Sequence, residues 1–200
     1  MVSVDPAWRA AVPRVVLARG RDGRPLDPST WGSGVVVGQR LAVTAFHVVA
    51  LGTEFRLEFP GGPAIEARLA AAYPQSDIAF LAAAVDLPAA PRSLVLTPPP
   101  PGALCYVVGY RLGYPDPPAA RTATLARIGG PLFLYQPYGV RAYPTLMVDS
   151  SAGGGDSGGA LFDSQGGLLG VVVGGSDDLA TGKRLTHVVP AALIHAAMAP

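Results

Sequence analysis

Short runs of apolar residues alternate with turn-forming residues along most of the chain. Many of these runs are rich in valine, leucine and alanine, and glycine, proline, aspartate or serine bounds them on both sides. This pattern predicts short β-strands, and so many strands predict a sandwich or barrel. The strands that we expect are 12–18, 34–37, 41–44, 54–59, 64–71, 78–83, 104–109, 121–128, 145–149, 159–162, 168–173 and 185–189.

The chain also contains signals for one helix and one linker. Residues 191–198 are rich in alanine and follow Pro190, which is the usual start of a helix. The prolines of 98–102 favour an extended segment that cannot join a central strand. We therefore expect one β-barrel in residues 1–97, a linker at 98–102, and a second barrel with the terminal helix in 103–200.

Composition limits the class of protein. Half of the 200 residues are hydrophobic, only 14% are charged, and the net charge is +1 without a run of either sign. This argues against disorder and against binding to nucleic acid or to a membrane surface. Residues 1–14 lack the uninterrupted apolar stretch of a secretion signal, and the single Cys105 forms no internal disulfide, so we expect a cytoplasmic protein.

The segment Gly155–Gly159, with the sequence Gly-Asp-Ser-Gly-Gly, has the features of a nucleophile loop. Glycines around a serine let the backbone bend so that the hydroxyl projects, and they let amide N–H groups converge on a developing oxyanion. Gly-x-Ser-x-Gly alone would be a weak signal in a chain with 25 glycines. The added aspartate and second glycine make the pattern much more specific.

Two further segments supply the partners that a serine nucleophile needs. His47 follows an apolar strand, and Asp77 stands at the start of another. A histidine in such a run is more often a packed core residue, but a carboxylate behind the ring would hold it in the tautomer of a general base. We therefore interpret His47 and Asp77 as partners of Ser157.

Together these segments resemble the trypsin-like serine protease superfamily, and they are most similar to the HtrA/DegP-type catalytic domain. The resemblance implies an all-β fold of two antiparallel six-stranded barrels, and peptide hydrolysis through an acyl-enzyme. It implies that Ser157 is the nucleophile, His47 the general base, Asp77 its orienting acid, and the N–H groups of Gly155 and Ser157 the oxyanion hole. It implies a polypeptide substrate and no cofactor or metal. Further matches lie at 32–34, 108–113, 149 and 186–190.

By the same analogy, residues 151–152 form the bottom of the pocket for the substrate residue before the scissile bond, and the strand end 173–175 forms its wall. His187 lies on the neighbouring strand. No acid stands at the expected base of the pocket, which predicts a small or medium apolar substrate residue and poor cleavage after Arg or Lys. His187 would favour Glu or Asp if it reached the pocket, although a packed histidine is the expected reading. The predicted pocket residues are Ser151, Ala152, Val173, Gly174, Gly175 and His187.

Asp156 departs from the HtrA-type pattern, which usually carries Asn at this position. Digestive proteases pair this aspartate with a freshly cleaved amino terminus, and no activation site is evident near Arg14. A local arginine, a protein partner or self-assembly could take that role. We expect a partner or self-assembly that orders the glycine-rich loop 151–155.

Three other functions were weighed against a protease. An α/β-hydrolase esterase would need more chain after Ser157 than the 43 residues present (200 − 157). A catalytically silent, protease-like binding module usually lacks a member of the triad, and all three are present here. A zinc hydrolase would need ligand spacing that the three histidines and one cysteine do not show.

Overall fold

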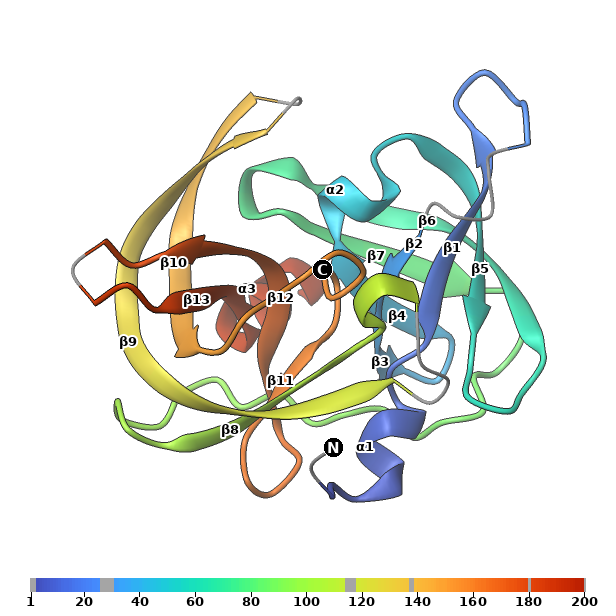
Figure 1. Cartoon of the computed structure of the whole chain (residues 1–200). Coiled ribbons are helices and arrows are strands. Elements are labelled where there is room, and N and C mark those ends of the chain that lie inside the picture. Colours follow the sequence, from blue (N-terminus) through green and yellow to red (C-terminus); the bar gives the residue numbers. More distant parts are fainter. Residues whose placement is uncertain (1–2, 26–30, 114–117, 137–138, 180, 200) are drawn as a thin grey trace.

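The computed structural model describes residues 3–25, 31–113, 118–136, 139–179 and 181–199. Two antiparallel β-sheets lie side by side, each strongly curved, with short helices at their margins (Figure 1). The strands are β1 (Arg14–Gly20), β2 (Trp31–Ser33), β3 (Val35–Gly38), β4 (Leu41–Ala45), β5 (Gly52–Glu58), β6 (Ala64–Tyr73), β7 (Ile78–Ala83), β8 (Leu104–Gly109), β9 (Ala119–Gln136), β10 (Gly139–Asp149), β11 (Ala160–Phe162), β12 (Leu168–Asp177) and β13 (Arg184–Pro190). The α-helices are α1 (Pro6–Ala10), α2 (Phe46–Val49) and α3 (Ala191–Met198), and single 3-10 turns span Pro74–Ser76 and Arg111–Gly113.

The first sheet has seven strands in the order β2-β1-β5-β6-β7-β4-β3. Its two edge strands, β2 and β3, are consecutive in the chain and are separated only by Gly34. The six strands expected here become seven because what would be one strand is bent at Gly34. The chain itself therefore joins the two edges of the sheet around a core that includes Phe55, Leu57 and Leu81.

The second sheet closes completely, in the order β10-β13-β12-β11-β8-β9. Alternate side chains point inward and fill the barrel with small and branched apolar residues, including Val107, Leu125 and Leu161. Cys105 belongs to this core, and burial raises the pKa of its thiol to about 11. The predicted two-barrel, all-β class is confirmed, with one closed barrel and one joined through a bend.

A third apolar cluster packs the two sheets against each other. It contains Val43 and Phe80 from the first sheet, and Val108 and Phe162 from the second. The Trp8 ring of α1 lies 5.8 Å from the Phe162 ring, so the start of the chain packs against the second barrel. This shared core fixes the position of one barrel relative to the other, and any site between them inherits that rigidity.

The local structure differs from the sequence-based expectation at three places. Strands β9 and β10 are much longer than the expected 121–128 and 145–149. The short helix α1 was not expected; the Asp5 side chain accepts a hydrogen bond from the N–H of Ala7 at its start. The strand expected at 41–44 ends at Ala45, and His47 lies after it in the single turn α2, which was not expected.

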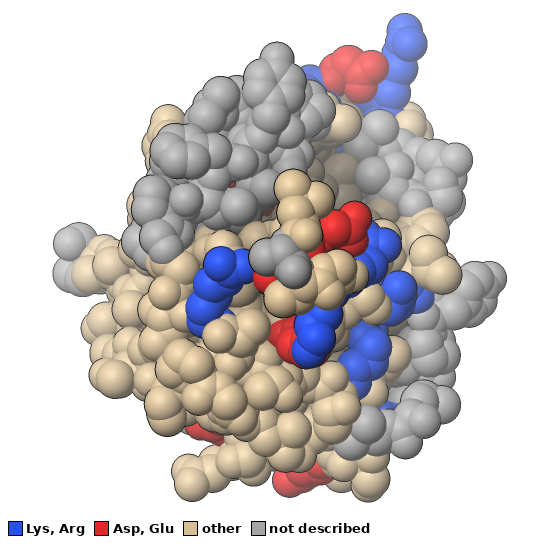
Figure 2. Space-filling view, turned by 60° about the vertical axis from the view of Figure 1, so that its left-hand side comes forward, with Lys and Arg blue, Asp and Glu red and all other residues tan. Residues whose placement is uncertain are grey.

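Charged side chains on the surface lie close to partners of opposite sign. On the face in Figure 2, the basic and acidic residues are adjacent to one another and form no field of a single sign. The ion pairs of the described residues include Arg40–Asp86, Lys183–Asp149 and Arg19–Glu54. Among the described helices, none has the length and apolar character needed to cross a membrane.

Candidate active site

Asp77 holds His47 by two bonds from one carboxylate. Its Oδ2 lies 2.8 Å from His47 Nδ1, and its Oδ1 accepts the His47 backbone N–H at 2.9 Å. The Asp77 side chain is fully buried, whereas the His47 side chain is 19% exposed. An ionised carboxylate only accepts hydrogen bonds, so Nδ1 carries the proton and Nε2 is left free to accept one.

The backbone around Asp77 explains how the acid reaches the histidine. Asp77 has a left-handed backbone conformation with a φ of 53°, which aspartate tolerates better than most residues. Its carbonyl oxygen accepts the Phe46 N–H at 3.0 Å. The first turn of a helix leaves its N–H groups without partners, and here Asp77 satisfies those of Phe46 and His47 in α2. One residue thus fixes both the helix turn and the imidazole.

Ser157 reaches the same region from the second barrel. Its carbonyl oxygen accepts the Ser33 N–H at 2.8 Å. A Cβ atom placed on Gly32 would lie 2.9 Å from the Ser157 carbonyl oxygen and 2.7 Å from the side chain of Val48, the neighbour of His47. The Ser157 backbone and the side chain of Val48, the neighbour of His47, therefore lie against the same strand, β2.

Two glycines of the loop occupy positions that no other residue would fit. Gly155 has a φ of 87°, and a Cβ atom there would collide with the Tyr110 carbonyl group and lie 2.8 Å from Trp31 Nε1. Gly158 has a φ of 84°, and a Cβ atom there would collide with the Ser33 carbonyl group. The loop passes so close to its neighbours that only glycine meets both the space and the backbone angles.

The N–H groups of the two predicted oxyanion donors have no hydrogen-bond acceptor among the described residues. Neither the N–H of Gly155 nor that of Ser157 donates a hydrogen bond to any residue that the structure describes. The next two N–H groups along the chain are both used: Gly158 donates to Val172 and Gly159 to Asp156. An arrangement of this kind is suited to an external oxygen that becomes negatively charged.

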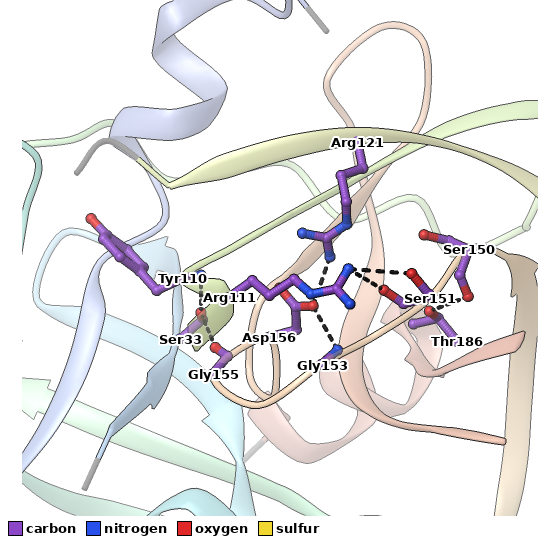
Figure 3. A network of polar contacts seen from close by, with 10 residues as sticks. All are labelled: Ser33, Tyr110, Arg111, Arg121, Ser150, Ser151, Gly153, Gly155, Asp156 and Thr186. Carbon is purple, nitrogen blue, oxygen red and sulfur yellow. Dashed lines mark hydrogen bonds and ion pairs between the residues drawn. The ribbon is translucent and has the colours of Figure 1, made fainter. Parts of the chain in front are cut away.

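Asp156 is paired within the chain. Arg121 Nη2 on β9 lies 2.7 Å from Asp156 Oδ2, and the Gly153 N–H donates to the same oxygen at 2.9 Å (Figure 3). The Asp156 side chain is only 1% exposed. A buried carboxylate requires such a partner, and the local arginine, which we considered but did not favour, fills this role.

A second arginine holds the outer part of the loop. Arg111 Nη1 donates to the Ser151 carbonyl oxygen at 3.0 Å and to Ser151 Oγ at 3.2 Å (Figure 3). A Cβ atom on Gly153 would lie 2.7 Å from Arg111 Nε, so the guanidinium packs directly against the loop. Both ends of the segment 151–156 are therefore attached to arginines.

The predicted pocket residues lie around the same loop. A Cβ atom on Gly175 would lie 3.6 Å from the Ala152 Cβ, so these two predicted walls are close together. Val173 is buried, and Gly174 pairs with His187 in the sheet. Ser151, which we expect at the bottom of the pocket, is hydrogen-bonded to Arg111, and it is not an acidic residue.

His187 is packed rather than open. It is 2% exposed, and its Nε2 lies 2.7 Å from Ser176 Oγ. Burial is the main cause that lowers the pKa of His187, and the nearby charge of Arg127 lowers it further. Over the part of the chain that the structure describes, no three histidine, cysteine, aspartate or glutamate side chains are grouped as metal ligands.

Sequence reasoning missed the residues that support the loop from a distance, namely Ser33, Arg111 and Arg121. Ser33 and Arg111 lie in the segments 32–34 and 108–113 that match the family pattern, but that match gave them no role in supporting the loop. Arg121 is the first residue of an expected strand and follows two alanines. Nothing in the linear sequence connects these positions to residues 153–156.

Comparison with known sequences identifies the family. The trypsin-like peptidase domain matches residues 32–171, a range that includes His47, Asp77 and Ser157. The serine protease Rv3671c of Mycobacterium tuberculosis is 34% identical over 186 residues, which is 91% of this chain and 45% of that protein. The chain therefore spans about half the length of the curated relative that it matches.

Solved structures show the same fold. The active form of Rv3671c protease superposes with a TM-score of 0.81 at 26% identity, covering 98% of this chain and 86% of the other. The HtrA-type protease AlgW with a tripeptide gives a TM-score of 0.75 at 22% identity, covering 95% of this chain and 59% of the other. The match to the family domain, the curated relative and the two-barrel fold together show that this chain belongs to the trypsin-like peptidase family.

Proposed function

We propose that this chain is a serine endopeptidase that hydrolyses polypeptides through an acyl-enzyme. The observation that carries the proposal is that the buried Asp77 carboxylate makes two hydrogen-bond contacts with His47, one with its backbone N–H and one with Nδ1. The contact with Nδ1 leaves Nε2 of His47 available for proton transfer, and the position of the Ser157 backbone and of Val48 against the same strand, β2, supports the pairing of His47 with Ser157. Family membership supports the same reaction.

In this mechanism Ser157 Oγ attacks the scissile carbonyl while His47 Nε2 takes its proton. The Gly155 and Ser157 N–H groups stabilise the resulting oxyanion, each typically worth about 10²–10³ in rate. His47 then returns the proton to the leaving amine, and water hydrolyses the acyl-enzyme by the same base. Asp77 stays ionised and stabilises the imidazolium.

The direct test uses a fluorophosphonate and the variant Ser157→Ala. Intact-mass analysis should show one adduct on the wild-type chain and none on the variant, and the variant should lose about 10⁶ in turnover on a peptide or casein substrate. Unchanged circular dichroism is the control for folding. Cleavage retained by a folded variant would overturn the mechanism, and absence of both labelling and cleavage in the wild type would identify a catalytically silent module.

We also propose that the residue before the scissile bond is small or medium and apolar, such as Ala, Val or Leu. The close approach of Gly175 and Ala152 supports a narrow pocket, and the Arg111 charge beside Ser151 disfavours Arg or Lys. His187 is hydrogen-bonded to Ser176, and burial lowers its pKa and so disfavours the charged form, which argues against selection of Glu. A peptide-library profile with a maximum at Arg or Lys would contradict this assignment, and a maximum at Glu would place His187 in the pocket.

We propose that the loop 151–156 is ordered within the chain. Arg121 supplies the charge that we expected from a protein partner or from self-assembly. An external activator would then add to an already paired Asp156 and would not be required for activity. An amino terminus produced by cleavage would likewise find the Asp156 carboxylate already paired with Arg121.

A further inference from the structure

Ser33 makes four hydrogen bonds, two of which connect the first barrel to the catalytic loop. Its N–H donates to the Ser157 carbonyl oxygen at 2.8 Å, and its own carbonyl oxygen accepts from Thr44 Oγ1 at 2.7 Å. Its hydroxyl donates to the Gly155 carbonyl oxygen at 2.7 Å and accepts the Tyr110 N–H at 2.9 Å. The side chain is fully buried, so the hydroxyl has no access to solvent.

These bonds have a specific relation to the oxyanion donors. The hydroxyl bond holds the Gly155 carbonyl group, and the neighbouring Gly154 carbonyl oxygen accepts the Leu112 N–H at 2.6 Å. In a trans peptide the C=O and the following N–H point in opposite directions, so fixing the Gly154 carbonyl also directs the Gly155 N–H. Both peptide groups that flank the Gly155 α-carbon are thus anchored, and Figure 3 shows the bond between Ser33 and Gly155.

The loop needs such anchors because its sequence provides little stiffness. Gly153, Gly154 and Gly155 are consecutive, and glycine loses more backbone entropy on ordering than any other residue. Gly155 also adopts a φ of 87°, from which a rotation of the adjoining peptide group would carry its N–H away from the site. A peptide group that rotates freely is a poor oxyanion donor, because catalysis by such donors depends on their being oriented before the reaction.

We propose that Ser33 is a positioning residue of the oxyanion hole. Its hydroxyl clamps the Gly155–Asp156 peptide group on one side of the Gly155 α-carbon, while the Leu112 N–H holds the Gly154–Gly155 peptide group on the other, so that together they keep the Gly155 N–H directed at the substrate oxygen. The hydroxyl itself does not touch the substrate. The inference rests on the proposed serine protease function. It also makes the first barrel a contributor to oxyanion stabilisation, in addition to supplying His47 and Asp77.

The test compares Ser33→Ala with Thr44→Val in the full chain. Ser33→Ala removes only the hydroxyl, so kcat should fall about 10- to 100-fold, somewhat less than deletion of an oxyanion donor, with KM changed less than about threefold. Thr44→Val removes a neighbouring buried hydroxyl that holds the Ser33 carbonyl and not the loop. Its kcat should stay within about threefold of the wild type although its thermal stability falls comparably.

A second readout separates positioning from general loosening of the fold. A peptide aldehyde forms a hemiacetal whose oxygen occupies the oxyanion hole, so its Ki should rise in Ser33→Ala by about the factor lost from kcat. If Ser33→Ala does not fold, Ser33→Cys retains the size with a weak donor, and the same loss of kcat is expected. Wild-type kcat in Ser33→Ala or Ser33→Cys would overturn the inference, as would equal losses of kcat in Ser33→Ala and Thr44→Val. Failure of the wild type to label with a fluorophosphonate would instead refute the protease function.

Discussion

His47 and Asp77 lie next to the ends of two paired strands of the first sheet, whereas the Ser157 loop is held by side chains that are distant in the sequence. Strands β4 and β7 pair directly, and Ala45 lies opposite Ile78. His47 follows Ala45 by two residues and Asp77 directly precedes Ile78, so strand pairing places the two catalytic candidates close together. The loop 151–156 instead depends on Ser33, Arg111 and Arg121, which lie 122, 40 and 35 positions from their partners. One half of the site is built into a β-ladder, and the other half is assembled by tertiary contacts.

The two halves should therefore respond differently to substitution. A β-ladder resists local change, so a substitution at His47 or Asp77 should remove a catalytic group and leave the local structure intact. The loop has three consecutive glycines, so loss of a contact that holds it should disorder it. Substitutions in the first half should therefore reduce the rate per competent molecule, and substitutions in the second should reduce the fraction of competent molecules.

The largest effect in this comparison is expected for Asp77→Asn. An amide in place of the carboxylate favours the wrong imidazole tautomer, so kcat should fall by about 10⁴. Asp86→Asn is the matched control, because Asp86 is an exposed acid whose partners are Gln39 and Arg40. Steady-state assays on both variants decide the point. A large loss in Asp86→Asn with activity retained in Asp77→Asn would show that the wrong acid was chosen.

A smaller effect on rate, with a large effect on stability, is expected for Arg121→Met. It leaves Asp156 buried without its cationic partner, which typically costs about 3–5 kcal/mol when a buried pair is broken. Active-site titration should show a reduced competent fraction, while turnover per titrated site stays close to that of the wild type. Arg127→Met is the control, because Arg127 forms an exposed pair with Asp178 at 3.4 Å. Equal losses of titratable fraction in the two variants would show that the Arg121–Asp156 pair matters no more than an exposed ion pair.

The smallest effect concerns pH and His187. Burial lowers the pKa of His187 below the ordinary 6.5, so the unfolded chain binds a proton that the folded chain does not. Stability should therefore fall as the pH drops below about 6.5, by at most about 1.4 kcal/mol per pH unit from this group. Urea unfolding of wild type and His187→Gln between pH 7 and pH 5 measures the difference in slope. Identical slopes would show that folding does not lower the pKa of His187.

The sequence predicts the ladder half of the site more completely than the loop half, for a physical reason. Ile78–Ala83 and Leu104–Gly109 have the bounds that the apolar pattern predicts, because burial of these residues decides their structure. His47 and Asp77 stand beside such strands, so their approach follows from strand pairing. Arg121 reaches Asp156 only through the closure of the second barrel, and no pattern in the sequence encodes that distance.

The long hairpin of β9 and β10 shows a different limit. The expected strand stops at Ile128, because Gly129, Gly130 and Pro131 are residues that usually end a strand. In the structure β9 continues through them, and Pro131 pairs with Pro144 where the register shifts. The ladder therefore continues where the local residues predict a break, because pairing with β10 over many residues outweighs the local preference.

Arg121 pairs with Asp156 within the chain, and we propose that the loop 151–156 is ordered without an external activator. The decisive experiment is active-site titration of the purified chain before and after limited trimming of residues 1–14. We expect nearly one titratable Ser157 per chain before trimming and no increase afterwards. A titratable fraction that is low at first and rises severalfold on trimming would refute the proposal.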